Sequence, residues 1–183
     1  QPTIIQHNTV SYAIFLQEIT NPTNLKLIPN FNEKALSAKI MKDNNCTYGV
    51  NSGFYTKQNT PLGLFFTNNT YIENNIHSPS LFNGFVFKTT AGKLNISTEP
   101  PPTDIEFAFQ SGPLFTPQTK LRIIEDESAR RMLLGTTNNN TFFFIALTQQ
   151  ENSQSGPPLE DLPEIIKKLN TPQLTTLINL DGG

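Results

Sequence analysis

Short apolar and β-branched runs, each bounded by Asn, Gly, Ser or Pro, recur along most of this chain. Such runs are typical of β-strands separated by turns. The runs that predict strands are residues 10–16, 25–28, 48–51, 62–67, 71–73, 85–88, 94–97, 105–110, 132–136, 141–148 and 177–180. Asparagines at 138–140 predict a hairpin, because asparagine tolerates left-handed turn conformations. Residues 1–35 are expected to contain an N-terminal strand pair.

Two segments instead have apolar residues at helical spacing. In residues 33–42, Leu36 and Ile40 lie four apart, and Asn32 is placed to cap the helix. In residues 159–169 the apolar positions recur in the same way, and Pro163 fits in the first turn. Many strands and two helices in mixed order predict an α+β fold, with a large mixed β-sheet flanked by two or more helices.

Length and charge limit the classes of function. A chain of 183 residues predicts one domain, spanning residues 1–183. The net charge is −2, so the chain lacks the basic surface that would indicate a nucleic-acid partner. No apolar run approaches the ~20 residues needed for a membrane span.

The sequence identifies no metal site and no cofactor. Cys46 is the one cysteine, which excludes an intrachain disulfide. His7 and His77 have no metal-ligand spacing with each other or with Cys46. A P-loop, a Rossmann fingerprint, a His-Glu-x-x-His motif and a Gly-x-Ser-x-Gly motif are all absent from the sequence.

Two glycine-containing blocks carry candidate binding groups. In residues 51–55, an amide at Asn51 supplies both a donor and an acceptor for a sugar or phosphate, and Gly53 permits a tight backbone path. In residues 110–113, Gly112 would let backbone N–H groups approach an anion. Each block also fits a plain turn at the end of a strand.

Arg131 is the cation of most interest, because a guanidinium group matches phosphate geometry and stays charged. Arg130 beside it leaves the choice open, and either side chain would also suit a surface ion pair with the acidic residues 125–127.

Asp181 is the carboxylate of most interest. It follows the apolar run 177–180 and precedes Gly182 and Gly183. That pattern is typical of a buried strand that delivers an acid to a surface turn.

These blocks, in this order, resemble the phosphodiester glycosidase family over residues 36–183. The family has an Asn-Gly-Gly-Phe-like motif at residues 51–54, where this chain has Ser52 at the middle position. The family also has an arginine at a fixed spacing before a glycine, and by the spacing to Gly135 that arginine corresponds to Arg131. The resemblance implies that Arg131 and Asp181 are catalytic. It implies a substrate-binding set of Asn51, Ser52, Gly53, Gln110, Ser111, Gly112, Gly182 and Gly183.

The resemblance also implies a hydrolase that cleaves the bond between a sugar anomeric carbon and a phosphodiester oxygen, with an N-acetylhexosamine as the sugar. The expected partner is a sugar-phosphate or polysaccharide substrate. One alternative is a non-enzymatic carbohydrate- or cell-envelope-binding domain, because the same amides and aromatic residues would serve binding. Another is a hydrolase of teichoic-acid-like or capsular phosphodiesters.

The ends and the composition suggest how the protein is processed. The chain starts at Gln1 without methionine, so we expect a processed or trimmed form. The family pattern continues beyond Asp-Gly-Gly, so we expect the C-terminal end of the domain to lie outside this sequence. The high Asn, Lys and Ile content is typical of an AT-rich, bacterial genome, which fits an exported envelope protein.

Overall fold

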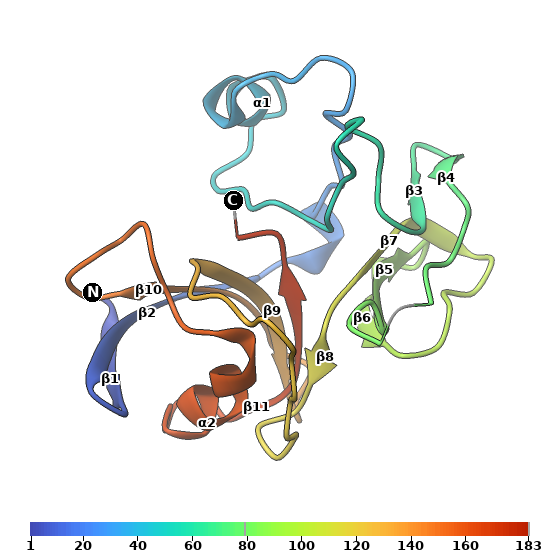
Figure 1. The fold of residues 1–183 in the computed structure, drawn as a ribbon. Helices are drawn as coiled ribbons and strands as arrows, with labels where there is room; N and C mark the ends of the chain where they lie inside the picture. Colours follow the sequence, from blue (N-terminus) through green and yellow to red (C-terminus); the bar gives the residue numbers. More distant parts are fainter. Residues whose placement is uncertain (79, 183) are drawn as a thin grey trace.

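The computed structural model describes residues 1–78 and 80–182, which form two antiparallel β-sheets and two short α-helices (Figure 1). The first sheet has the order β1 (Thr3–His7), β2 (Val10–Glu18), β10 (Phe142–Gln149), β9 (Arg131–Thr137), β11 (Leu174–Leu180) and β8 (Leu114–Phe115). The second has the order β4 (Thr70–Glu73), β3 (Phe65–Thr67), β7 (Ile105–Ser111), β5 (Gly84–Thr89) and β6 (Leu94–Ser97).

The expected α+β class fits this sheet-dominated chain only in outline, and the expected single mixed sheet is wrong. The strand pairs of the described residues are antiparallel, and the strands divide between two sheets. Pairing does not follow chain order: β2 pairs with β10, and β11 lies between β9 and β8. The spacing of apolar residues identifies a strand but does not say which other strand it pairs with.

The predicted helices are present but shorter than expected. The first is α1 (Ser37–Asp43), and the turn before it is organised by Asn30 rather than capped by Asn32: Asn30 Oδ1 accepts from Ala35 N at 2.8 Å, and Asn30 Nδ2 donates to Ala35 O at 3.0 Å. The second begins as a 3₁₀ turn, η2 (Leu159–Asp161), and continues as α2 (Leu162–Lys167).

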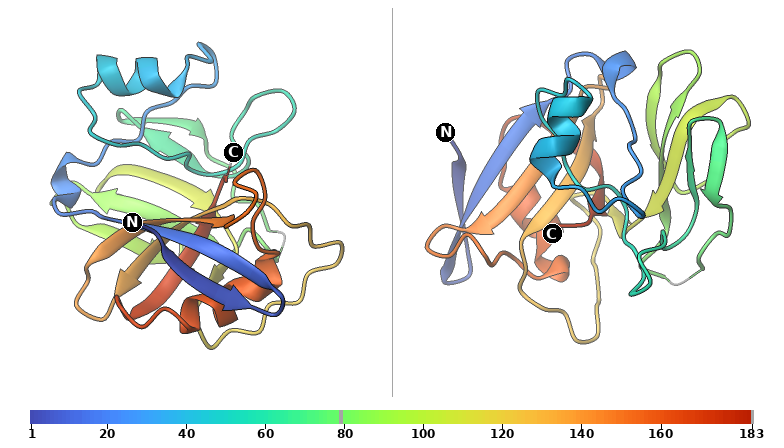
Figure 2. Two further views of the ribbon diagram at one scale, coloured as in Figure 1. Left: turned by 90° about the vertical axis from the view of Figure 1, so that its left-hand side faces the viewer. Right: turned by 90° about the horizontal axis from the view of Figure 1, so that it is seen from above.

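The strands predicted at 25–28 and 48–51 do not form. These residues are irregular and belong to a long connection between β2 and β3 that also carries the 3₁₀ turn η1 (Pro22–Asn24) and α1. We call residues 20–50 of this connection the arm. No residue of η1 or α1 is buried, and α1 stands outside both sheets (Figure 2).

One apolar layer joins the two sheets, and a second lies between the first sheet and α2. Along β11, Ile178 and Leu180 face the second sheet, whereas Leu177 faces α2. The layer between the sheets contains the buried residues Ile19, Phe65, Val86, Leu94, Phe107, Phe109, Leu134, Phe142, Phe144, Ile178 and Leu180. The first sheet is therefore apolar on both faces, which explains why its strands lack strict polar alternation.

A fully buried lysine attaches the arm to the second sheet. The Lys88 Nζ donates to the carbonyl oxygens of Thr23 at 2.9 Å and Leu25 at 2.7 Å, and it lies 2.9 Å from Glu106 Oε1. It also lies 5.6 Å from the centroid of the Phe107 ring. A buried ammonium group is tolerated only when its donors are satisfied, so these partners fix the path of residues 23–25.

Replacing Lys88 by methionine should destabilise the fold by about 3 kcal/mol, because removing one partner of a buried pair leaves the others desolvated. Denaturant unfolding measures this loss, and hydrogen exchange should show faster exchange in residues 20–28. The exposed Lys93, changed to methionine, is the matched control and should stay within about 0.5 kcal/mol of wild type. Equal stability of the two variants would contradict the anchoring role.

Candidate functional site

The sequence blocks singled out above meet at the end of β11. The backbone N–H of Asp181 donates to the Ser52 carbonyl oxygen at 2.9 Å. Gly53 lies directly against the Gln110 carbonyl oxygen, and any Cβ atom at Gly53 would overlap that oxygen. Glycine is required there because the two backbones approach each other so closely.

The arginine block joins the same junction from the other side. Leu180 pairs with Met132 in the β9–β11 ladder, and this register places Asp181 beside Arg131. Gly182 lies against the Arg130 carbonyl oxygen, where a Cβ atom would overlap it. Gly183 lies outside the described residues, so its predicted role has no structural counterpart here.

Ser111 and Gly112 contribute to a buried polar seam between β7 and β11. The Ser111 Oγ donates to the Asn179 carbonyl oxygen at 2.6 Å, and Asn179 Nδ2 donates to the Gly112 carbonyl oxygen at 3.2 Å. Asn179 N also donates to the Pro113 carbonyl oxygen at 3.0 Å. The predicted ligand groups of Ser111 and Gly112 thus connect the two sheets, and neither residue lines the cleft described below.

Asn179 is a buried polar residue that the sequence analysis missed. It interrupts the apolar end of β11, between Ile178 and Leu180, and the residue is 2% exposed. Its Oδ1 has no hydrogen-bond partner among the described residues. A polar residue inside the run 177–180 was the available signal, because a buried amide in a strand needs a specific reason.

The polar atoms of the Gln110 side chain are all hydrogen-bonded within the fold. Its Oε1 accepts from His77 N at 2.9 Å, and its Nε2 donates to the carbonyl oxygens of His77 and Phe82, both at 2.7 Å. The residue is 2% exposed and does not line the cleft. Gln110 therefore holds the loop between β4 and β5, and the structure does not support its predicted contact with a substrate.

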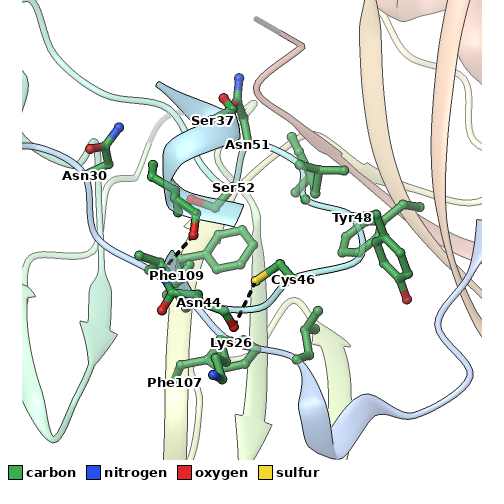
Figure 3. Close-up of a pocket in the computed structure, with 18 of the residues that line it drawn as sticks. Lys26, Asn30, Ser37, Asn44, Cys46, Tyr48, Asn51, Ser52, Phe107 and Phe109 are labelled. Atoms are coloured by element: carbon green, nitrogen blue, oxygen red, sulfur yellow. Dashed lines mark hydrogen bonds between the residues drawn. The ribbon is translucent and has the colours of Figure 1, made fainter. Parts of the chain in front are cut away.

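A cleft of about 1170 Å³ opens beside this junction, between the arm, the inner face of the second sheet and the ends of β9 and β11 (Figure 3). Five of the predicted site residues line it: Asn51, Ser52, Gly53, Asp181 and Gly182. Figure 3 shows Asn51 and Ser52 toward one end, and Lys26 and Phe107 toward the other. We call the end with Ser52 and Asp181 the proximal end, and the end with Lys26 and Phe107 the distal end.

Arg131 is turned away from the cleft. The Arg131 Nε donates to the Pro157 carbonyl oxygen at 2.8 Å, and its Nη2 donates to the Glu127 carbonyl oxygen. The same nitrogen lies 3.6 Å from Asp126 Oδ1, and both side chains are largely buried. Burial lowers the pKa of the Arg131 guanidinium, and the Asp126 carboxylate opposes this shift.

These contacts give Arg131 a structural role here, and its expected role as a phosphate clamp stays a prediction. Its donors are occupied by carbonyl groups and by Asp126, one of the acidic residues that the sequence offered as an alternative partner. Asp126 also accepts from the backbone N–H groups of Leu159 at 2.9 Å and Glu160 at 2.8 Å. Arg131 and Asp126 together hold the loop before β9 against the start of η2.

Two carboxylates line the cleft among the described residues, Asp181 and Glu106. Glu106 lies at the distal end, where it pairs with the buried Lys88. With ~3.3 Å of rise per residue, it is roughly 16 Å along β7 from Ser111.

No group of three or more His, Cys, Asp or Glu side chains in residues 1–78 and 80–182 is placed to hold a metal ion. No helix in these ranges is long and apolar enough to cross a bilayer.

Residues 44–183 match the phosphodiester glycosidase family. The chain belongs to this family. The match covers all of the converging blocks, so the junction described above is built from the family's own segments. A search among curated proteins finds no match.

Two solved structures resemble this phosphodiester glycosidase family member across its full length. One is the catalytic domain of zebrafish N-acetylglucosamine-1-phosphodiester alpha-N-acetylglucosaminidase, auto-inhibited by its pro-peptide, with 15% identity and a TM-score of 0.62. The other is a hypothetical protein from Synechocystis, with 12% identity and a TM-score of 0.59. The present chain covers 69% of the first and 56% of the second. At these identities the likeness establishes the fold.

Changing Arg131 to glutamine in this family member should cost about 3 kcal/mol of unfolding free energy, because Asp126 would lose its buried partner. Thermal or denaturant unfolding measures the loss. Arg122, which is exposed, is the control and should tolerate glutamine within about 0.5 kcal/mol. A double-mutant cycle with Asp126→Asn should show coupling between the two sites. Wild-type stability of Arg131→Gln would contradict the structural role.

Proposed function

We propose that this chain is a hydrolase that cleaves the bond between a sugar anomeric carbon and a phosphodiester oxygen, with Asp181 as its catalytic carboxylate. The observation that carries the proposal is the position of Asp181: it is fixed at the end of a buried strand and lines the cleft beside Asn51 and Ser52. Family membership and the fold of the zebrafish enzyme support the same class of reaction.

The leaving group explains why one carboxylate is sufficient at the proximal end. Most glycosidases use a second carboxylic acid to protonate the departing oxygen. A departing phosphomonoester has a pKa of about 6, whereas an alcohol is nearer the ~15.7 of water. The phosphate can therefore leave with the bonding electron pair and little protonation.

The atoms balance as an ordinary hydrolysis. The bond between the anomeric carbon and the phosphate oxygen breaks, and the electron pair stays on the phosphate. Water supplies the hydroxyl group of the sugar, and its proton is released. Asp181 acts as nucleophile, as base toward that water, or as stabiliser of the oxocarbenium-like centre. The products are a free sugar and a phosphomonoester. An N-acetylhexosamine is the sugar we propose, on the strength of the family alone.

The phosphate needs a cation, and we propose Arg130 in place of Arg131. Met132 lines the cleft, and side chains two residues apart in an extended segment lie on the same side. Arg130 immediately precedes β9, and its backbone carbonyl lies against Gly182, which lines the cleft, although Arg130 is not itself among the lining residues. A guanidinium group there would stabilise the charge that develops on the departing phosphate.

A non-enzymatic carbohydrate-binding domain is the second candidate. Asn51 lines the cleft, and its amide would serve a neutral sugar equally well. Saturable binding of sugar phosphodiesters without turnover would favour this function. For both candidate functions we propose an exported location, because the Asn-, Lys- and Ile-rich composition is typical of a bacterial envelope protein.

Asp181→Asn should lower kcat for a sugar-1-phosphodiester by about 10²–10⁴, because the substitution removes a catalytic carboxylate and preserves its shape. Release of free sugar and phosphomonoester is the measurement, and unchanged thermal unfolding shows that the fold is intact. The exposed Asp104, changed to asparagine, is the matched control. Full activity of Asp181→Asn would refute the assignment.

Arg130→Gln should lower kcat/KM by about 10²–10³, because it removes charge stabilisation of the departing phosphate. Arg130→Lys should recover part of the loss, since a point charge replaces the planar fork. Arg122→Gln is the control for a change of net charge. If Arg130→Gln keeps wild-type kcat/KM, the phosphate is held by other groups and this part of the proposal fails.

A further inference from the structure

The cleft extends well beyond the junction that holds Asp181. Its volume of about 1170 Å³ exceeds the roughly 300–1,000 Å³ of ordinary small-molecule sites. The distal end lies along β7, past the buried rings of Phe109 and Phe107, and reaches Lys26 on the arm (Figure 3). A single sugar phosphate bound beside Asp181 would not reach Lys26 at the far end of the cleft if it stays at the proximal end, so the distal end requires a separate explanation.

A bulge directs Glu106 into the distal end. The β5–β7 register pairs Lys88 with Phe107 and Thr89 with Ile105, so Glu106 has no partner in the ladder. Bulges re-aim side chains in this way. The carboxylate is then held 2.9 Å from the Nζ of the fully buried Lys88. Its negative charge is therefore balanced by a lysine that contacts no solvent.

This balance leaves Lys26 as the dominant charge of the distal end. Lys26 is exposed, lines the cleft, and takes part in no ion pair within residues 1–78 and 80–182. Lys34 adds a second positive charge on the arm, also without an ion pair in these ranges. Asn44 also lines the distal end, and its Nδ2 donates to the Ile40 carbonyl oxygen at 2.9 Å, so its amide oxygen takes no part in that bond. A recess whose uncompensated charge is positive matches a phosphate group on a sugar or polyol chain.

The recess also continues beneath the arm. A smaller hollow of about 170 Å³ adjoins the distal end and shares Lys26, Asn44, Phe107 and the Lys88-paired Glu106 with the cleft. Lys88 holds the preceding residues of the arm, Thr23 and Leu25, against the second sheet. Lys26 is thus presented from an anchored backbone, which lowers the entropic cost of using its charge for binding.

We propose that the distal end is a second phosphate subsite, with Lys26 as its main cation, and that the substrate is an extended sugar–phosphate chain carrying at least two phosphates. The inference rests on the proposed function, because it assumes that the bond cleaved lies beside Asp181. It adds the substrate class: a polymer or oligomer with repeated phosphodiesters is preferred over a single sugar phosphodiester.

Three synthetic substrates test the subsite. The first is a sugar-1-phosphodiester with one phosphate. The second has the same sugar with its aglycone extended by a second phosphate, and the third has a neutral aglycone of matched length. We expect kcat/KM to be highest for the second and to fall with added salt. Lys26→Gln should reduce the preference for the second over the third by about two- to fivefold, as for an exposed charge pair.

Control variants separate a local effect from a general loss of charge. Lys26→Arg should keep the preference, and Lys120→Gln, an exposed lysine outside the cleft lining, should also keep it. Equal kcat/KM for the second and third substrates in the wild type would overturn the proposal. A preference that survives Lys26→Gln unchanged would overturn it too.

Failure of the proposed function gives a different result. In that case none of the three substrates is hydrolysed, and calorimetric binding of the same compounds replaces kcat/KM. Tighter binding of the two-phosphate compound, weakened by Lys26→Gln, would then still support the subsite in a binding domain. Binding that does not distinguish the charged from the neutral compound would refute it.

Discussion

The burial of β11 on both faces is the constraint on which the site depends. Leu177, Ile178 and Leu180 are almost fully buried, and the strand pairs with β9 on one edge and β8 on the other. Each such side chain contributes roughly 1.5–3 kcal/mol when buried. The strand therefore cannot slip or rotate without exposing the central layers, and the position of Asp181 follows from it. A carboxylate fixed in this way is preorganised before any ligand arrives.

The glycine-containing blocks support this strand more than they contact the cleft. Ser111, Gln110 and Asn179 direct their polar groups into the interior, where each unpaired group would cost free energy. Gly53 and Gly182 let neighbouring backbones come close enough to close the junction. A short motif can therefore look like a ligand site because it contains Asn, Gln, Ser and Gly. Those same residues are also the ones that satisfy a buried backbone.

The local elements were predictable from sequence because their signals are local. The strands β2, β5, β6, β7, β9, β10 and β11 and both helices follow from apolar spacing and turn residues. The arm was not predictable. Residues 25–28 have strand-like composition, but the side chain of Lys88, which is distant in sequence, donates hydrogen bonds to the carbonyl oxygens of Thr23 and Leu25. The path of this segment therefore depends on a residue that its local sequence does not contain. The division into two sheets depends on long-range pairing, which hydrophobic period does not encode.

The candidate site was predictable in position and only partly in detail. The order of the blocks located Asp181, Asn51, Ser52 and Gly53 in one place, and the structure brings them together. The proposed choice of Arg130 over Arg131 depends on which face of the sheet each side chain occupies where β9 begins. Spacing in a sequence does not give that face unless the register is known.

The scarcity of acids in the cleft has a chemical meaning. A glycosidase that expels an alcohol needs an acid beside the departing oxygen, and the proximal end offers Asp181 as its carboxylate among the described residues. Glu106 is committed to Lys88 at the other end. A phosphate leaving group removes the need for a strong acid and replaces it with a need for positive charge. A lining with lysines, amides and a single proximal carboxylate is suited to a leaving group that needs positive charge and no strong acid.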